Sequence, residues 1–438
     1  MTATNWPFTG GRAIAIASAE GSELLTTDGQ RILDAAGGAI VSNIGHGRER
    51  VAQAIYQATR DCTYVVPPWV TPGRQALVEQ LQQHWLPAHL NRIHIASGGS
   101  EAVESGLKIA LQYHAARGET QRTKIISREV SYHGTTITTA TLSGHPARKR
   151  GLSQALTENP KTLTPYPLRS PLGMNHPDSA RYYADALAAT IEAEGPNNIA
   201  AFLAEPITGS SGGALVPPDG YWPMVRELCD EHGILLVLDE VMTGFGRTGR
   251  KFGYQHFGIE PDILVAGKGL AGGYAPIGGI FAAQPIGDAI RAAGYSVMFH
   301  TFGAHPAACA GAAEVLQILV EEDLVSRAAY LGERLQSRLQ DLFANHAHVA
   351  QVRGLGLLQA IEVVADRNTL APFPERAQIG SRIIAKGLER GVFYYGGGTG
   401  AVRDIVCLGP AFTTSEAQIE TMAVTLKEAV DAALADAP

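Results

Sequence analysis

One lysine in the sequence stands in surroundings that favour chemistry over solvation. Lys268 follows a strand-like run, Ile263 to Ala266, and it is the only charged residue between Ile263 and Ile277. Burial among apolar residues and glycines disfavours the ammonium form and lowers the pKa of a lysine, and the neutral amine forms Schiff bases with carbonyl groups. We therefore interpret Lys268 as a candidate catalytic residue.

A carboxylate stands at the end of the preceding strand-like run, Ile234 to Leu238. The side chain of Asp239 should emerge at the carboxyl edge of the sheet, where open α/β folds build their sites. A carboxylate there can hold a proton on the ring nitrogen of a pyridine cofactor, which makes the ring an electron sink. An isolated aspartate more often caps a turn or pairs with a cation such as Arg247, and it is Lys268 that favours the catalytic interpretation.

Two further segments lie where a strand is expected to turn into a helix. Gly99 and Ser100 open one helix, and free N–H groups at a helix start bind phosphate, although an ordinary turn capped by Ser100 is an equal alternative. Tyr132 and His133 follow the run Lys124 to Ser127. An aromatic side chain there can lie flat on a cofactor ring, but a lone Tyr–His pair is more often packing or surface.

These residues sit at the ends of alternating elements, a pattern typical of a parallel sheet wrapped by helices. The short aliphatic runs are residues 92–96, 124–127, 200–204, 234–238, 263–266 and 278–282. We predict an α/β fold in three parts: an N-terminal segment of residues 1–50 that joins the smaller domain, a large cofactor-binding domain of residues 51–322, and a smaller α+β domain of residues 323–438.

The composition argues against several classes of protein. The 438 residues include 35 basic and 42 acidic side chains with their signs interspersed, so neither nucleic acid nor an anionic membrane is an expected partner. The four cysteines lie far apart without a Cys-x-x-Cys pair, which predicts free thiols and a cytoplasmic location. No leader and no membrane-spanning run is recognisable, so export and insertion are not expected.

Taken together and in their order, the motifs of the chain resemble those of the class III aminotransferases, the omega-transaminase branch of the fold type I pyridoxal phosphate enzymes. The resemblance runs nearly from end to end. The motifs that carry it are Gly45-His-Gly-Arg48, Gly99-Ser-Glu-Ala102, Tyr132-His-Gly134, Ala204-Glu-Pro206, Leu238-Asp-Glu-Val241, Gly244-Phe-Gly-Arg-Thr-Gly249, Gly267-Lys-Gly269, His300-Thr-Phe302 and Val352-Arg-Gly-Leu-Gly356.

The resemblance implies a cofactor, pyridoxal 5'-phosphate, and a role for each matching residue. Lys268 would form the Schiff base and shuttle a proton, and Asp239 would hold the pyridine nitrogen. The remaining cofactor residues would be Gly99 and Ser100 at the phosphate, Tyr132 stacked on the ring, His133 beside it, Glu205 near the ring, and Thr301, which would reach the phosphate in a neighbouring subunit. A site completed by a second chain implies a homodimer or a higher homo-oligomer.

The chain departs from the family where many members place an arginine for the substrate carboxylate. That position falls near Gly400, and the nearest candidate, Arg403, stands beside Asp404 as in a surface ion pair. Gly98 also replaces a frequent serine. The other residues expected in the substrate pocket are Ile40, Tyr64 and Trp69, each of which is also explained by core packing.

The sequence leaves some alternatives open and closes others. The segment Gly209-Ser-Ser211-Gly-Gly213 fits a hydrolase motif, but the prolines that follow prevent an immediate helix. Lys268 fails the P-loop pattern, and His346 and His348 lack a third ligand, so no metal site is predicted. We expect amino transfer from an amine or an amino acid, ω-amino acids included, to a 2-oxo acid, with pyruvate favoured slightly over 2-oxoglutarate, by a ping-pong mechanism. A decarboxylase or an aminomutase on the same fold remains the alternative.

Overall fold

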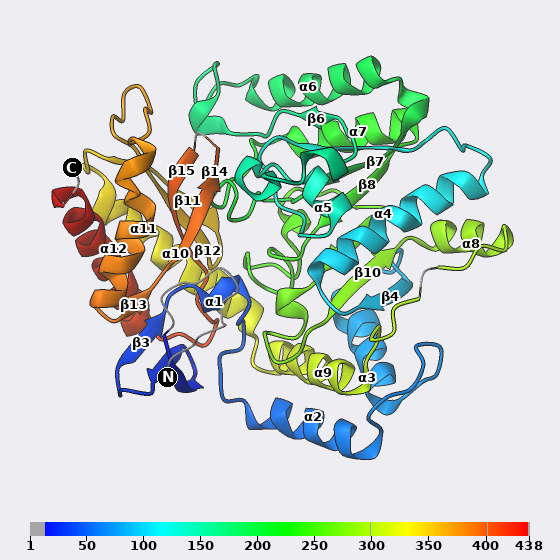
Figure 1. Cartoon of the computed structure of the whole chain (residues 1–438), viewed down its shortest axis with the longest axis horizontal. Coiled ribbons are helices and arrows are strands. Elements are labelled where there is room, and N and C mark those ends of the chain that lie inside the picture. The colour runs from blue at the N-terminus through cyan, green and yellow to red at the C-terminus, as the bar shows by residue number, and fades with distance from the viewer. Residues whose placement is uncertain (1–13, 298, 401, 437–438) are drawn as a thin grey trace.

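The computed structural model describes residues 14–297, 299–400 and 402–436, and a seven-stranded sheet runs through its larger part (Figure 1). The strand order is β4-β10-β9-β8-β7-β5-β6. Strand β10 runs antiparallel to both its neighbours, whereas the pairs β9–β8, β8–β7, β7–β5 and β5–β6 are parallel. The predicted mostly parallel sheet is therefore confirmed. Its strands are β4 (Arg92–Ala96), β5 (Lys124–Arg128), β6 (Lys161–Thr162), β7 (Ile199–Ala204), β8 (Leu235–Asp239), β9 (Ile263–Ala266) and β10 (Gly278–Ala282).

Helices cover both faces of this sheet, which explains why its strands are nearly continuous in apolar residues. On one face, Val103 and Leu107 of the long helix α4 join a core cluster with Val237, Val265 and Ile280 of the strands. The helices of this part are α4 (Gly99–Ala116), α5 (Ile137–Leu142), α6 (Ser179–Glu194), α7 (Tyr221–His232) and α8 (Gln284–Ala292).

A helical layer lies along the lower edge of the view in Figure 1. Helices α2 (Glu49–Asp61) and α3 (Pro72–Gln80) both pack on α9 (Pro306–Glu321), which continues toward α10 (Leu324–Phe343). Thr71 caps α3 by accepting a hydrogen bond from the backbone N–H of Arg74, and Pro72 occupies the first turn, where a missing N–H is harmless. A short π-helical stretch, Leu81–Trp85, follows α3.

The C-terminal part forms a second, antiparallel sheet with the order β11-β12-β15-β14. Its strands are β11 (Val349–Leu355), β12 (Leu358–Val363), β14 (Tyr395–Thr399) and β15 (Val402–Leu408). The helices α10, α11 (Ile379–Glu389) and α12 (Glu416–Ala435) pack in this part of the molecule. A capping box at Ser415 and Gln418 starts α12, because each side chain accepts a hydrogen bond from the other residue's backbone N–H.

The beginning and the end of the chain meet in a third sheet with the order β1-β2-β3-β13. Leu33 and Asp34 of β3 pair in parallel with Val392 and Phe393 of β13. The strands are β1 (Ile16–Glu20), β2 (Glu23–Thr26), β3 (Arg31–Asp34) and β13 (Val392–Phe393), and the short helix α1 (Gly37–Ile40) follows. The N-terminal segment thus touches the C-terminal part, while the boundaries at residues 50 and 322 stay a prediction.

Candidate active site

Three neighbouring parallel strands bring three ionisable side chains to one edge of the large sheet. Ala204 at the end of β7 pairs with Leu238 of β8, and Asp239 pairs with Val265 of β9. Glu205, Asp239 and Lys268 therefore emerge side by side at the carboxyl ends of their strands. They line one cavity of about 200 Å³, whose wall also includes four predicted cofactor residues, Gly99, Ser100, Tyr132 and His133.

Lys268 combines an altered pKa with an unusual backbone conformation. Its φ of +37° is uncommon for a residue with a side chain and is a form of strain found at functional sites. Burial lowers the pKa of Lys268 to about 8, although the negative charges of Asp239 and Glu205 oppose this shift. No ion pair of Lys268 occurs among the residues that the structure describes. Roughly a tenth of the amine is therefore neutral at pH 7, far more than for an ordinary lysine.

Asp239 is buried and fixed in orientation by two hydrogen bonds. Its Oδ2 lies 2.8 Å from Nδ1 of His133, and its Oδ1 accepts a hydrogen bond of 3.0 Å from the backbone N–H of Val241. The other ring nitrogen of His133, Nε2, is buried without a hydrogen-bond partner in the described part of the chain. A buried polar atom in that state indicates a missing group, and His133 lines the cavity where a cofactor would lie.

The carboxylate of Glu205 holds two backbone segments of the cavity wall by hydrogen bonds. Its Oε1 accepts a hydrogen bond of 3.0 Å from the N–H of Gly209, and its Oε2 accepts one of 3.3 Å from the N–H of Tyr132. Burial raises the pKa of Glu205, and the nearby charge of Asp239 adds to this effect. Two backbone segments at adjacent strand ends are thereby held together by one side chain.

The start of helix α4 forms an anion cradle. The N–H groups of Gly99 and Ser100 donate no hydrogen bond within residues 14–297, 299–400 and 402–436, and the helix dipole points its positive end toward them. A Cβ at Gly99 would lie 3.0 Å from Cγ1 of Val241, so glycine allows the two walls of the cradle to approach. The Oγ of Ser100 accepts a hydrogen bond of 3.1 Å from the N–H of Thr135. A phosphate group fits these donors.

The ring of Tyr132 forms part of the cavity wall and is held from outside. Its centroid lies 5.7 Å from that of His145, with the two rings at 89°, and 4.8 Å from Cζ of Arg148. Burial, together with the charges of Arg148 and Lys149, lowers the pKa of His145 to about 4, so this imidazole is neutral at pH 7. The two contacts restrict the ring to one orientation.

The sequence profile of the family described as Aminotransferase class-III matches residues 9–430. The chain belongs to the class III aminotransferases. Among its relatives are the taurine–pyruvate aminotransferase of Rhodobacter capsulatus, 35% identical over 94% of this chain and 90% of that protein, and the diaminobutyrate–2-oxoglutarate transaminase of Halomonas elongata, 32% identical over 95% of this chain and 90% of that protein.

A solved structure supports the fold and the cofactor of this aminotransferase. The omega transaminase from Pseudomonas jessenii in complex with PMP superposes with a TM-score of 0.91 at 32% identity, over 97% of this chain and 93% of that one. The fold is accordingly that of the fold type I transaminases, and the cofactor is pyridoxal phosphate. The orphaned Nε2 of His133 and the open cradle at Gly99 fit a phosphorylated ring compound.

The other predicted residues do not line this cavity within a single chain of the aminotransferase. Thr301 is exposed on a turn closed by the hydrogen bond from the N–H of Gly303 to the carbonyl of His300. Tyr64 is also exposed and meets Phe302 edge-on, with ring centroids 6.3 Å apart.

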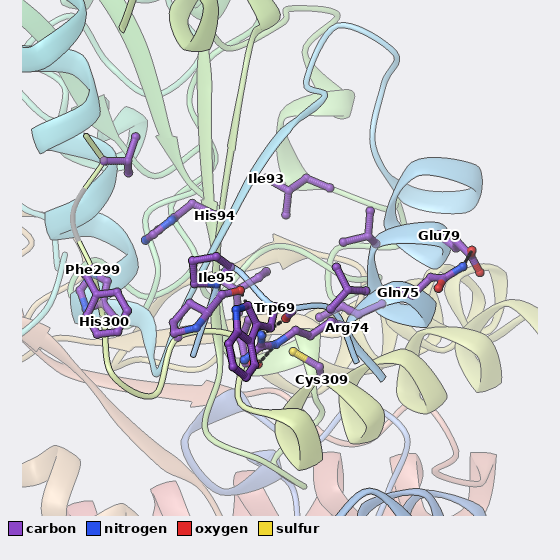
Figure 2. A pocket seen from close by; sticks show the side chains of 18 of the residues that line it. Trp69, Arg74, Gln75, Glu79, Ile93, His94, Ile95, Phe299, His300 and Cys309 are labelled. Carbon is purple, nitrogen blue, oxygen red and sulfur yellow. Dashed lines mark hydrogen bonds between the residues drawn. The ribbon is translucent and has the colours of Figure 1, made fainter. Parts of the chain in front are cut away.

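Trp69 lines a second, larger hollow of about 670 Å³ together with His94 and His300 (Figure 2). Ile40 is buried in a core cluster with Leu358 and Ile405. These placements leave the assignment of Ile40 and Trp69 to the substrate pocket as a prediction.

Arg403, the candidate for binding the substrate carboxylate, is engaged elsewhere. Its guanidinium donates hydrogen bonds of 3.2 Å to the carbonyl of Phe373 and 3.4 Å to that of Gly400. The neighbouring carboxylate, Asp404, accepts a hydrogen bond of 3.0 Å from the N–H of Gly380. Arg403 does not line the cavity of Lys268.

The sequence reasoning missed several residues of the cavity wall. They follow Glu205 or Asp239 within five positions, so their closeness to a strand end could have identified them as residues of the site. These residues are Ile207, Ser210, Val241, Met242 and Thr243.

All four cysteines of the aminotransferase are free thiols. Within the described ranges, no helix has both the length and the apolar character needed to cross a membrane.

Proposed function

We propose that this aminotransferase moves an amino group from an amine or an amino acid, ω-amino acids included, to a 2-oxo acid in ping-pong order. The observation that carries the proposal is the convergence of Lys268 and Asp239 at one edge of the sheet, with the anion cradle of Gly99 and Ser100 in the same cavity. In this order the donor product would leave before the acceptor binds, and the presence of Lys268 and Asp239 in one cavity of about 200 Å³ supports the use of a single site by both substrates.

Each residue has one task in this proposal. Bound pyridoxal phosphate supplies an electron sink. The N–H groups of Gly99 and Ser100 would hold its phosphate, Tyr132 would stack on its ring, and Asp239 would keep a proton on its ring nitrogen. Nζ of Lys268 accepts the proton that leaves the donor carbon and returns it to a neighbouring atom, which its lowered pKa favours.

Pyruvate is our preferred acceptor. A dicarboxylate such as 2-oxoglutarate normally requires two cationic groups, and Lys268 is the only lysine or arginine among the described residues that line the cavity. Among the similar proteins, two are named for pyruvate and one is named for 2-oxoglutarate. A panel of amines tested with both acceptors distinguishes the two.

The proposed assembly is a homodimer in the cytoplasm. Thr301 is exposed and lies between Phe299 and Phe302, which are both 61% exposed. A second copy of the chain that covered these rings would bring Thr301 to a neighbouring cavity. The free cysteines support a reducing compartment.

The visible absorption spectrum of the purified protein tests the proposed function. A yellow protein that an amine bleaches and a 2-oxo acid restores would establish both half-reactions. A protein that stays colourless after incubation with pyridoxal phosphate would contradict the role of Lys268. Release of carbon dioxide, or formation of an isomer without any acceptor, would instead favour the decarboxylase or the aminomutase.

A further inference from the structure

Two lysines that line a hollow of about 460 Å³ have no acidic partner. Lys161 lies on β6, and Lys149 ends the short 3₁₀ helix Pro146–Lys149. Neither forms an ion pair with any residue of the ranges 14–297, 299–400 and 402–436. A partly buried cation is normally paired with a carboxylate. Neither lysine lines the cavity of Lys268, so this hollow is separate from the site of amino transfer.

Neutral oxygen atoms hold both ammonium groups. Nζ of Lys161 donates a hydrogen bond of 2.7 Å to Oγ of Ser127 and another to the carbonyl of Leu142. Nζ of Lys149 donates one of 2.9 Å to the carbonyl of Thr141. Because an ammonium carries three N–H groups, Lys161 retains one donor and Lys149 retains two in the described part of the chain. Two positive charges at one hollow therefore still have hydrogen bonds to give.

The two ammonium groups also repel each other. Burial lowers the pKa of Lys161 to about 7, and the positive charge of Lys149 adds to this shift. Burial lowers the pKa of Lys149 as well. Repulsion between cations that have lost part of their hydration costs free energy, and an anion bound between them removes that cost. The pair is therefore arranged to receive a counter-ion from outside the chain.

The other charged residues of the hollow do not neutralise this pair. Lys124 lines the hollow too, but its Nζ lies 2.5 Å from Oε2 of Glu194, so these two charges balance each other. Glu158 also lines the hollow, and its side chain is exposed to water, which screens its charge. The hollow thus combines three lysines with two carboxylates and keeps an excess of positive charge.

We propose that this hollow binds a phosphate group between Lys149 and Lys161, either as the free ion or as part of a small phosphate ester. A phosphate group carries a charge of about −1.5 to −2 at pH 7, which matches two ammonium groups better than the single charge of a carboxylate does. Lysine binds phosphate as a point charge. Leu156, Thr157 and Asn159 line the same hollow and would contact the organic part of an ester. This site goes beyond the proposed amino transfer and does not depend on it.

The test measures binding of phosphate to the enzyme with its cofactor in place. In this form Gly99 and Ser100 would already hold the phosphate of the cofactor, so added phosphate reports on other sites. Equilibrium dialysis with radioactive phosphate gives the number of ions bound per chain and the dissociation constant. The variants are Lys161→Met and Lys149→Met. Lys108→Met is the matched control, because Lys108 is exposed on α4 and its replacement removes the same charge outside the hollow.

We expect the wild type to bind one phosphate per chain in the hollow. The dissociation constant should rise more than about tenfold in Lys161→Met and in Lys149→Met, since each change removes one of two charged donors. Lys108→Met should bind phosphate as the wild type does.

Competition identifies the form of phosphate that the hollow prefers. Glycerol 3-phosphate should displace the labelled ion, whereas acetate at the same ionic strength should not. Displacement by glycerol 3-phosphate at a lower concentration than by unlabelled phosphate would assign the site to esters. The reverse order would assign it to the free ion.

Three results would overturn the inference. One is a wild type that shows no saturable binding of phosphate. Another is unchanged binding in Lys161→Met or Lys149→Met, with circular dichroism showing that the variant is folded. The third is equal displacement by acetate and phosphate, or an equal loss in Lys108→Met, because either would indicate a general attraction of anions to the protein. Lys149 lies on a short 3₁₀ helix and is only partly buried, so Lys149→Met decides the question even if Lys161→Met does not fold.

Discussion

At the residue scale, the chemistry of this aminotransferase depends on how burial changes individual side chains. Lys268 has a lowered pKa because its ammonium is desolvated, and its backbone is held at φ +37°. Asp239 keeps its orientation through His133 and Val241. An ordinary surface lysine would be protonated at pH 7 and could not act as a nucleophile.

Replacing Lys268 should remove the colour and the activity together. In Lys268→Ala we expect turnover to fall by more than about a thousandfold, because one side chain both attaches the cofactor and carries the proton. Steady-state rates and the visible spectrum measure this. Lys161→Met is the control, since burial lowers the pKa of Lys161 to about 7 as well, but Lys161 lies outside the cavity of Lys268. Near wild-type turnover in Lys268→Ala would contradict the assignment.

The pKa of Lys268 predicts how attachment of the cofactor depends on pH. Only the neutral amine attacks a carbonyl, and burial places half-deprotonation at about pH 8. The rate at which the cofactor-free protein becomes yellow with pyridoxal phosphate should rise as pH increases to about 8 and level off above it. Stopped-flow absorbance between pH 6 and 10 measures the profile. A rate that still rises tenfold per pH unit above pH 9 would indicate an unperturbed lysine.

At the element scale, the start of α4 and the end of β8 form one cradle. Gly99 lies against Val241, and the neighbouring Gly98 has no heavy atom within 4 Å of where its Cβ would stand. Gly98 has an extended backbone with φ 178°, which any residue adopts. A side chain at position 99 would therefore collide with Val241, whereas the space at position 98 is open to one.

Substitutions at these two glycines should have opposite outcomes. Gly99→Ala should weaken binding of pyridoxal phosphate roughly tenfold, because its Cβ would lie 3.0 Å from Cγ1 of Val241 and widen the cradle. Gly98→Ala should bind the cofactor as the wild type does. Titration of the cofactor-free proteins, followed by absorbance, gives both constants. Equal affinities in the two variants would show that the cradle is not the phosphate site.

A buried arginine holds another element in place. The guanidinium of Arg74 on α3 donates hydrogen bonds to the carbonyls of Val65, Val66, Pro67 and Trp69 and to that of Ala304 (Figure 2). The segment 65–69, which carries Trp69, is thus fastened to the turn that follows Thr301. Arg74 therefore positions both the segment of Trp69, a predicted substrate-pocket residue, and the turn of Thr301, a predicted contact to the phosphate in a neighbouring subunit.

Removing this guanidinium should cost stability and also change the reaction. Arg74→Met should lower the free energy of unfolding by about 3 kcal/mol, because several carbonyls lose their donor. Arg122→Met is the matched control: Arg122 is also buried and donates to the carbonyls of Pro196, Ile199 and His232. We expect both variants to lose stability in urea, but only Arg74→Met to raise KM for the donor. If Arg74→Met and Arg122→Met had the same KM for the donor, Arg74 would have no role in the substrate region.

At the scale of the whole molecule, the described surface retains exposed aromatic side chains beside the turn of Thr301. Trp69 is 65% exposed and Phe302 is 61% exposed, and both lie near the larger hollow or its rim. Apolar surface of this kind is typical of an interface.

Light scattering should give a mass close to twice the 46.4 kDa of one chain. Phe302→Asp should shift the protein toward monomer and accelerate loss of the cofactor, because a buried charge opposes association. Leu172→Asp, at another exposed apolar position, is the control. A monomeric wild type that keeps its cofactor would contradict the shared site.

The sequence by itself determined the residues whose role depends on local structure. Asp239 ends a strand, Lys268 follows the next one, and Gly99 opens a helix, so the short-range alternation of elements was enough to predict that these residues meet at one edge of the sheet. Glu205 was expected there only from the resemblance to the family. The apolar runs of the central strands likewise indicated a sheet covered on both faces.

Only the tertiary structure decided which charges are free. Arg403 stands beside Asp404 in the sequence, yet its guanidinium is bound to backbone carbonyls, whereas that of Arg148 rests on the ring of Tyr132. The tertiary structure also decided that the side chains of Trp69 and Thr301 are exposed in a single chain. The contacts of Arg403 with Phe373 and of Arg148 with Tyr132 join different elements, and their formation depends on how whole elements pack, which no local pattern records.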